Sequence, residues 1–206
     1  MASKTEQRRE DLRTRLIDSA ERTILADGLS ALKARALAQD AGCAVGAIYT
    51  VFDDLDQLTL AVNARTFRRL GAFVKDRTGD GGTPQDRLVA MGTAYLHFAA
   101  ANQPGWRALF DLAMTDDGPV PDWYRAELAA LFAQIAAPLR DLFPDWPAPR
   151  IDLMTRALFS SVHGMVLLGL QRRISAVPLD QIEAMIAILL RNVTTEKNLN
   201  GVQNNS

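Results

Sequence analysis

The sequence predicts an all-α fold, with a small N-terminal unit of about three helices and a larger helical body. Apolar residues recur at the helical period along nearly the whole chain of 206 residues. No segment alternates apolar and polar residues in the way that a half-buried strand requires. Prolines and glycines divide the apolar segments into lengths typical of single helices.

The N-terminal segments carry clear start and stop signals. Ser3 and Glu6 have the spacing of a capping box, and Asp27-Gly28 is expected to end the first helix. Two short helices should follow, separated by a turn at Ala41-Gly42-Cys43, and then a long helix that the stretch TGDGGTP ends. These three helices are predicted over residues 34–40, 45–51 and about 54–76.

The rest of the chain is a series of longer segments punctuated by proline. Helices are predicted over residues 84–102, 104–114, 121–143, 150–173 and 179–193. We expect a first domain over residues 1–53, a second over 54–193, and a polar, disordered tail over 194–206.

Composition limits the classes of function. A formal net charge of -1 gives no global basic signal, so any nucleic-acid binding must come from a local surface. Cys43 is the only cysteine, which excludes an internal disulfide and suits the reducing cytoplasm. The N-terminus MASKTEQRRE has no apolar core, so no signal peptide is expected. No apolar run in the sequence is predicted to be long enough to span a bilayer. We therefore expect a soluble cytoplasmic protein with no membrane partner.

Catalytic and metal chemistry lack candidate residues. His97 and His163 are the only histidines, and neither has a metal-ligating partner at helical spacing. No nucleophile–base arrangement is apparent either. We therefore predict no enzyme, no metal and no cofactor.

The turn at Gly42 indicates a helix-turn-helix. Glycine takes a positive φ there without steric cost, and Leu37, Ala41 and Ile48 fall where the two short helices would share a core. Gly46 costs about 1 kcal/mol of helix propensity relative to alanine. That cost is understandable if the backbone must approach another surface closely, and a phosphate-lined groove is one candidate.

The segment ARALAQDAGCAVGAIYTVF, with the following LDQLTLAV, resembles the N-terminal DNA-binding domain of TetR-family transcriptional repressors. The resemblance covers roughly residues 8–62 and rests on the Ala-Gly, Gly, Tyr and Phe positions found together. It implies that residues 1–53 bind double-stranded DNA. Lys33, Arg35 and Tyr49 would contact phosphates, while Val45, Ala47 and Thr50 would face base edges. Ala44 and Gly46 complete the predicted contact set, and Arg8 and Arg9 would form a flexible arm.

This sequence departs from the family pattern at several positions. Ala44 stands where a hydroxyl residue usually starts the recognition helix, and Leu55 stands where a lysine commonly contacts phosphate. Val51 replaces an aromatic residue or histidine, and Lys33 replaces a threonine cap. Residues 1–52 hold 8 basic and 7 acidic side chains, a balance of +1, and Asp53, Asp54 and Asp56 change it to -2. A protein of the same fold that has lost its operator affinity is therefore the alternative function.

The larger body suggests a ligand site and a dimer. Val162-His163-Gly164 resembles a ligand-domain subgroup named for a Trp-His-Gly signature. We predict an apolar cavity for a small hydrophobic or aromatic effector, with space left by Gly105 and Gly164; an ordinary packed core is the other interpretation. The predicted lining is Phe98, Trp106, Phe110, Met114, Phe159 and His163.

The last two long helices are expected to form a homodimer. The apolar residues Met185, Ile186, Ile188, Leu189 and Leu190 cover more than one face of the final helix. One side can pack on the protein's own core, and another needs a partner. The resemblance implies a four-helix packing across a two-fold axis.

Overall fold

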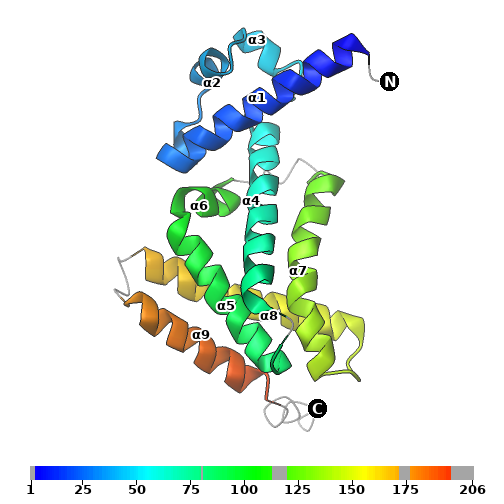
Figure 1. The fold of residues 1–206 in the computed structure, drawn as a ribbon, viewed down its shortest axis with the longest axis vertical. Coiled ribbons are helices and arrows are strands. Elements are labelled where there is room, and N and C mark those ends of the chain that lie inside the picture. Colours follow the sequence, from blue (N-terminus) through cyan, green and yellow to red (C-terminus); the bar gives the residue numbers. More distant parts are fainter. Residues whose placement is uncertain (1–2, 80, 113–119, 172–176, 196–206) are drawn as a thin grey trace, which may run out of the picture. The chain divides into compact units, whose positions relative to one another are not determined.

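The computed structural model describes residues 3–79, 81–112, 120–171 and 177–195 (Figure 1). These ranges contain helices and turns and no strand, which confirms the predicted all-α fold. The helices are α1 (Lys4–Asp27), the 3₁₀ helix η1 (Leu29–Ala31), α2 (Ala34–Asp40), α3 (Val45–Ile48), α4 (Leu55–Thr78), α5 (Pro84–Ala101), α6 (Gln103–Asp111), α7 (Asp122–Leu142), α8 (Ala148–Leu170) and α9 (Leu179–Val193).

The predicted capping box begins α1. The Ser3 hydroxyl accepts the Glu6 N–H at 3.2 Å, and the Glu6 carboxylate accepts the Ser3 N–H at 2.5 Å. The bond from the Ser3 backbone holds the pKa of Glu6 below its usual value. Because the helix starts at Lys4, Arg8 and Arg9 lie on its exposed surface. The expectation that these two residues form a flexible arm is therefore wrong.

The two short helices meet at the predicted turn. Gly42 has φ of +66°, and the Cys43 N–H donates to the Ala38 carbonyl at 2.9 Å, which closes α2. α2 has the predicted bounds, whereas α3 ends at Ile48 and residues 49–51 form a turn. The helix expected over residues 45–51 is thus a single helical turn followed by a tighter one.

A common core holds these short helices in place. The predicted core positions Leu37, Ala41 and Ile48 are confirmed, with Ile48 fully buried. They pack in one cluster with residues of α1, of the segment before α4, of the start of α4 and of α6: Leu16, Ile17, Ala20, Ile24, Phe52, Leu58, Ala61, Val62 and Ala108. Most of the stability of α3 must come from this packing, since so short a helix is unstable alone.

Ion pairs join α1 to the first half of α4. The Arg65 guanidinium lies 2.6 Å from the Asp18 carboxylate and 2.9 Å from that of Glu21. Arg69 pairs with the same Glu21 at 2.8 Å, and Glu21 is largely buried. Two acidic side chains of the N-terminal segment are therefore neutralised within the fold.

The chain divides into two compact units that do not follow the sequence order. Unit 1 holds residues 1–69 and 102–127, and unit 2 holds residues 70–101 and 128–206. This division differs from the functional boundary at residues 53/54, which stays a prediction. In unit 1, the Asn63 amide of α4 donates to the Ala108 carbonyl of α6 at 2.9 Å. At the C-terminal end, Thr194 is buried, so order extends past α9; the rest of the predicted tail, residues 196–206, lies outside the described residues.

The two glycines of the helix-turn-helix should respond oppositely to alanine. Gly42→Ala places a side chain at a positive φ and should lower the free energy of unfolding by about 1 kcal/mol or more. Gly46 has no positive φ, and an added methyl group would meet no atom within 4 Å. Gly46→Ala should therefore raise the free energy of unfolding, by up to about 1 kcal/mol. Urea denaturation of both variants measures the two free energies of unfolding. Equal changes in the two variants would contradict the different roles given to Gly42 and Gly46.

Candidate DNA-binding surface and effector site

The residues predicted to contact DNA lie at the surface of α2 and α3. Tyr49 is 50% exposed and Val45 is 39% exposed, although both are large and apolar or aromatic. Lys33, Arg35, Ala44, Gly46 and Thr50 are exposed, and Ala47 is half-buried. Ile48 and Phe52, by contrast, point into the core. The α3 segment thus presents one set of side chains outward while another anchors it.

The neighbouring hydroxyl groups of Tyr49 and Thr50 on this surface differ in their hydrogen bonding. The Thr50 hydroxyl donates to the Ala47 carbonyl at 2.7 Å, in the turn that ends α3. The Tyr49 hydroxyl makes no hydrogen bond with any described residue, and the ring lies half in solvent.

The departures from the family pattern leave helix ends uncapped. Ala44 is the N-cap of α3 and Lys33 is the N-cap of α2, and neither side chain accepts a hydrogen bond from its helix. Serine or threonine in these places would satisfy a backbone N–H. At the start of α4, the Asp54 carboxylate accepts the Gln57 N–H at 2.7 Å, so this acidic residue has a structural role.

The ion pairs change the electrostatic balance expected from the sequence. Asp18 and Glu21 pair with Arg65 and Arg69, and Asp40 pairs with Arg22 at 2.6 Å. Six basic side chains of the first 52 residues form no ion pair with any described residue: Lys4, Arg8, Arg9, Arg15, Lys33 and Arg35. Cations at this end of unit 1 are therefore more available than the residue count indicates.

Two of the predicted effector residues form an aromatic cluster in unit 2. The Tyr95 hydroxyl of α5 lies 2.8 Å from Nδ1 of His163 in α8, a partnership that the sequence did not reveal. The Phe159 ring stacks on His163 with a centroid distance of 5.6 Å, and Phe132 packs edge-on against Phe159. Burial lowers the pKa of His163 from its ordinary value of 6.5, which favours the neutral form of the imidazole.

The remaining predicted effector residues are dispersed. Phe98 is buried in unit 2 against Phe73, at a centroid distance of 5.6 Å. Trp106 and Phe110 pack on each other in unit 1, where Trp106 has no exposed surface. Met114 lies outside the described residues. A single pocket lined by all six stays a prediction.

The two glycines expected to leave space behave differently. An added Cβ at Gly105 would lie 2.7 Å from Leu25, so this glycine allows α6 to approach α1 and leaves no gap. The expectation of space at Gly105 is wrong for that reason. At Gly164 an added Cβ meets no atom within 4 Å, so the position is open.

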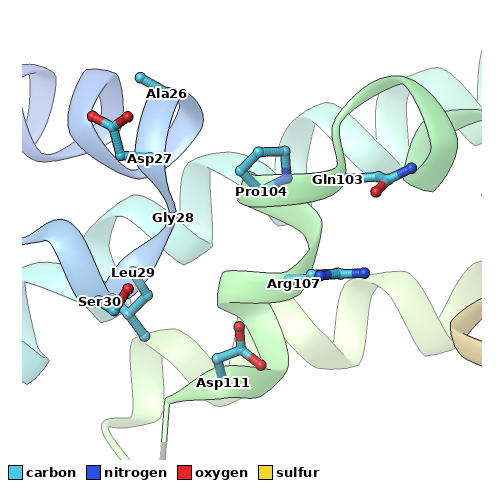
Figure 2. Close-up of a pocket in the computed structure, with 9 residues that line it drawn as sticks. All are labelled: Ala26, Asp27, Gly28, Leu29, Ser30, Gln103, Pro104, Arg107 and Asp111. Atoms are coloured by element: carbon cyan, nitrogen blue, oxygen red, sulfur yellow. The ribbon is translucent and has the colours of Figure 1, made fainter. Parts of the chain in front are cut away.

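A hollow of about 630 Å³ lies within unit 1, and none of the predicted effector residues that the structure describes lines it. Figure 2 shows Ala26, Asp27, Leu29 and Ser30 of the α1–η1 segment on one side and α6 on the other. The α6 side carries Gln103, Pro104, Arg107 and Asp111. In this view the Arg107 side chain points away from the α1–η1 segment. No sequence pattern indicates this hollow, because its two sides are far apart in the chain.

One helix has the length and composition of a membrane span. α8 is 23 residues long, is apolar enough by composition to cross a bilayer, and is only partly buried within the fold. The expectation that no apolar run is long enough is therefore wrong on these two criteria. Exposed Asp152, Arg156, Ser160 and Ser161 make α8 amphipathic, which suits a protein surface better than lipid. No group of metal-ligating side chains occurs in the described ranges.

An exposed helix-turn-helix on an all-α fold is typical of DNA-binding regulators. A family model described as "Tetracyclin repressor-like, C-terminal domain" matches residues 88–193, just over half of the chain. The chain belongs to this family, the TetR-family transcriptional regulators. The matched region includes Val162-His163-Gly164, whereas the Trp-His-Gly subgroup stays a prediction. No curated protein matches the chain.

Several solved structures share the fold. A protein of unknown function from Rhodococcus sp. RHA1 has a TM-score of 0.68 at 22% identity, over 87% of this chain and 93% of its own. A putative TetR-family regulator from Rhodococcus sp. has a TM-score of 0.65 at 18% identity, covering 89% and 99%. FadR from Bacillus subtilis, solved with stearoyl-CoA, has a TM-score of 0.63 at 14% identity, covering 86% and 96%.

The depressed pKa of His163 predicts a pH dependence of stability. Below about pH 6.5 the unfolded chain takes up a proton that the buried imidazole resists, so the free energy of unfolding should fall as the pH drops. His163→Gln should remove this contribution and flatten the curve on the acid side. Urea titrations of both proteins at about pH 7.5 and pH 5.5 measure the difference. An unchanged pH dependence in the variant would show that other groups cause it.

Proposed function

We propose that this protein is a dimeric, ligand-responsive transcriptional repressor of the cytoplasm. It binds a palindromic DNA operator and is released by a small apolar effector. The observation that carries the proposal is the exposed surface of α2 and α3, where Val45 and Tyr49 lie in solvent while Ile48 and Phe52 are buried. Family membership supports the same class of function.

The DNA-binding step uses both kinds of contact. Lys33 and Arg35, at the start of α2, would bind phosphates, and the Tyr49 hydroxyl would donate to another. Val45, Ala47 and Thr50 would face base edges in the major groove. Gly46 fits this arrangement, since nothing within the described fold requires a glycine there. Ala44, the uncapped start of α3, would lie beside the backbone of the DNA.

The alternative is a small-molecule-binding protein of the same fold with weak or lost operator binding. It is favoured by the uncapped Ala44 and by Leu55, which lack the groups found at these places in the family pattern. The repressor is favoured by six cations near α1 and α2 that form no ion pair with any described residue. An electrophoretic shift assay with the DNA upstream of the protein's own gene distinguishes the two functions.

The DNA proposal predicts a graded loss of operator binding. Arg35→Ala/Tyr49→Ala should weaken binding to all sequences by about tenfold or more, because two charged or polar phosphate contacts are lost. Binding by the wild type should also fall steeply as salt rises. The control is Gln39→Ala, an exposed change on the same helix. Wild-type affinity in the double variant would contradict the docking.

The dimer proposal rests on apolar side chains that the fold leaves uncovered. On α9, Ile188 is 63% exposed and Met185 is 42% exposed, whereas Ile186 and Leu190 are buried in unit 2. On α8, Leu168 is exposed, and Ser161 and Gly164 leave room along the same face. α8 and α9 also contact each other. A second copy would cover both helices in a four-helix packing.

The association state should respond to one substitution on this face. Ile188→Asp places a charge in the proposed interface and should raise the dimer dissociation constant at least about tenfold. Ala130→Asp, an exposed change on α7, is the matched control and should leave the dimer intact. Sedimentation or light scattering over a dilution series measures both. A wild type that is monomeric at all concentrations would contradict the proposed dimer.

The effector site is proposed around the aromatic cluster of unit 2. The cluster combines three aromatic rings with one neutral, half-buried imidazole, which suits a mainly apolar ligand with a polar group near His163. FadR, of similar fold, was solved with stearoyl-CoA, a ligand with a long apolar chain. A coupling of about 1–3 kcal/mol would lower operator affinity about 5–150-fold, and DNA would weaken effector binding equally.

A thermal-shift screen of small apolar molecules tests the sensor. Hits should stabilise the wild type, weaken the operator complex, and lose most of their effect in Phe159→Ala/His163→Ala. A hit that binds the double variant as tightly as the wild type would place the site elsewhere, for instance at the hollow in unit 1. Stabilising hits that never alter DNA affinity would show that the protein is not a ligand-operated switch.

A further inference from the structure

Tyr49 and Thr50 offer different hydrogen-bonding groups to a ligand, although both carry an exposed hydroxyl. The Thr50 proton is already donated to the Ala47 carbonyl at 2.7 Å, so the oxygen presents only lone pairs outward. The Tyr49 hydroxyl has no hydrogen bond to a described residue and can donate its proton. Because of the turn that ends α3, Thr50 presents a hydrogen-bond acceptor and Tyr49 a hydrogen-bond donor.

This difference decides what each residue can contact on DNA. Phosphate oxygens only accept hydrogen bonds, so a hydroxyl must donate to bind one. Tyr49 can do so directly, whereas Thr50 would first have to break its bond to Ala47. The lone pairs of the Thr50 oxygen can instead accept a hydrogen bond from a donor group on a base. In the major groove the base donors are the N6 amine of adenine and the N4 amine of cytosine.

We propose that Thr50 is a specificity-determining residue that accepts a hydrogen bond from the exocyclic amine of adenine or cytosine. The inference rests on the proposed operator binding and specifies its chemistry. Guanine O6 and thymine O4 face the same oxygen with lone pairs, and they are disfavoured at this position. Tyr49, beside it, contributes affinity and no base preference. Thr50 as a residue is exposed, so its methyl group could touch a neighbouring thymine methyl.

The test is selection of binding sites from a DNA pool randomised around an operator. The wild type should enrich adenine or cytosine at one position in each half-site. Thr50→Val keeps the branched shape but removes the acceptor, so it should lose the preference at that position alone. Its affinity for the selected site should fall about three- to tenfold, as expected for one neutral hydrogen bond. Thr50→Ser keeps the hydroxyl and should retain the preference.

Tyr49→Phe is the matched control for a phosphate contact. It should weaken binding to every selected site by a similar factor and leave all base preferences unchanged. If Thr50→Val behaves in this uniform way, or if the Thr50-dependent position selects guanine or thymine, the inference is overturned while operator binding stands. If the wild type enriches no sequence at all, operator binding fails and this inference with it. Circular dichroism of each variant confirms that the fold is retained.

Discussion

The DNA-binding surface depends on anchoring a helix that cannot form alone. α3 has four residues, one turn, and isolated helices need about three times that length to be even marginally stable. Ile48 and Phe52 bury their side chains among residues of α1, α2 and α4, and that packing fixes the orientation of the exposed positions between them. The turn at Gly42 has the same purpose, since only its positive φ lets α2 and α3 share this core.

The number of available positive charges in the same region depends on which side chains form ion pairs, and the composition does not indicate it. The sequence suggested that acidic residues would largely cancel the basic ones. The fold instead places Asp18 and Glu21 against Arg65 and Arg69, which lie far along the chain. Asp54 binds a backbone N–H at the start of α4. Because Asp18 and Glu21 pair with arginines of α4, six cations of α1 and the start of α2 form no ion pair within the described part of the chain, which the net charge near zero does not indicate.

The sequence was sufficient for local features and insufficient for distant ones. The capping box at Ser3, the turn at Gly42 and the bounds of α2 depend on neighbouring residues, and all were predicted. The contact between Tyr95 and His163 joins residues 68 positions apart, and no pattern in one sequence reports it. Gly105 illustrates the same limit: glycine is compatible with a gap or with close packing, and only Leu25 on another helix decides which occurs.

Unit 1 is assembled from two separate stretches of the chain, and this affects how the protein can be divided. Ala108 belongs to the core that surrounds α3, Gly105 contacts Leu25, and Asn63 binds the Ala108 carbonyl. An N-terminal fragment cut at residue 53 or 69 would lack α6 and would expose part of its own core to water. Chimeric regulators built by fusing residues 1–53 to a foreign ligand domain would therefore need a replacement for α6, and the natural unit of exchange includes residues 102–127.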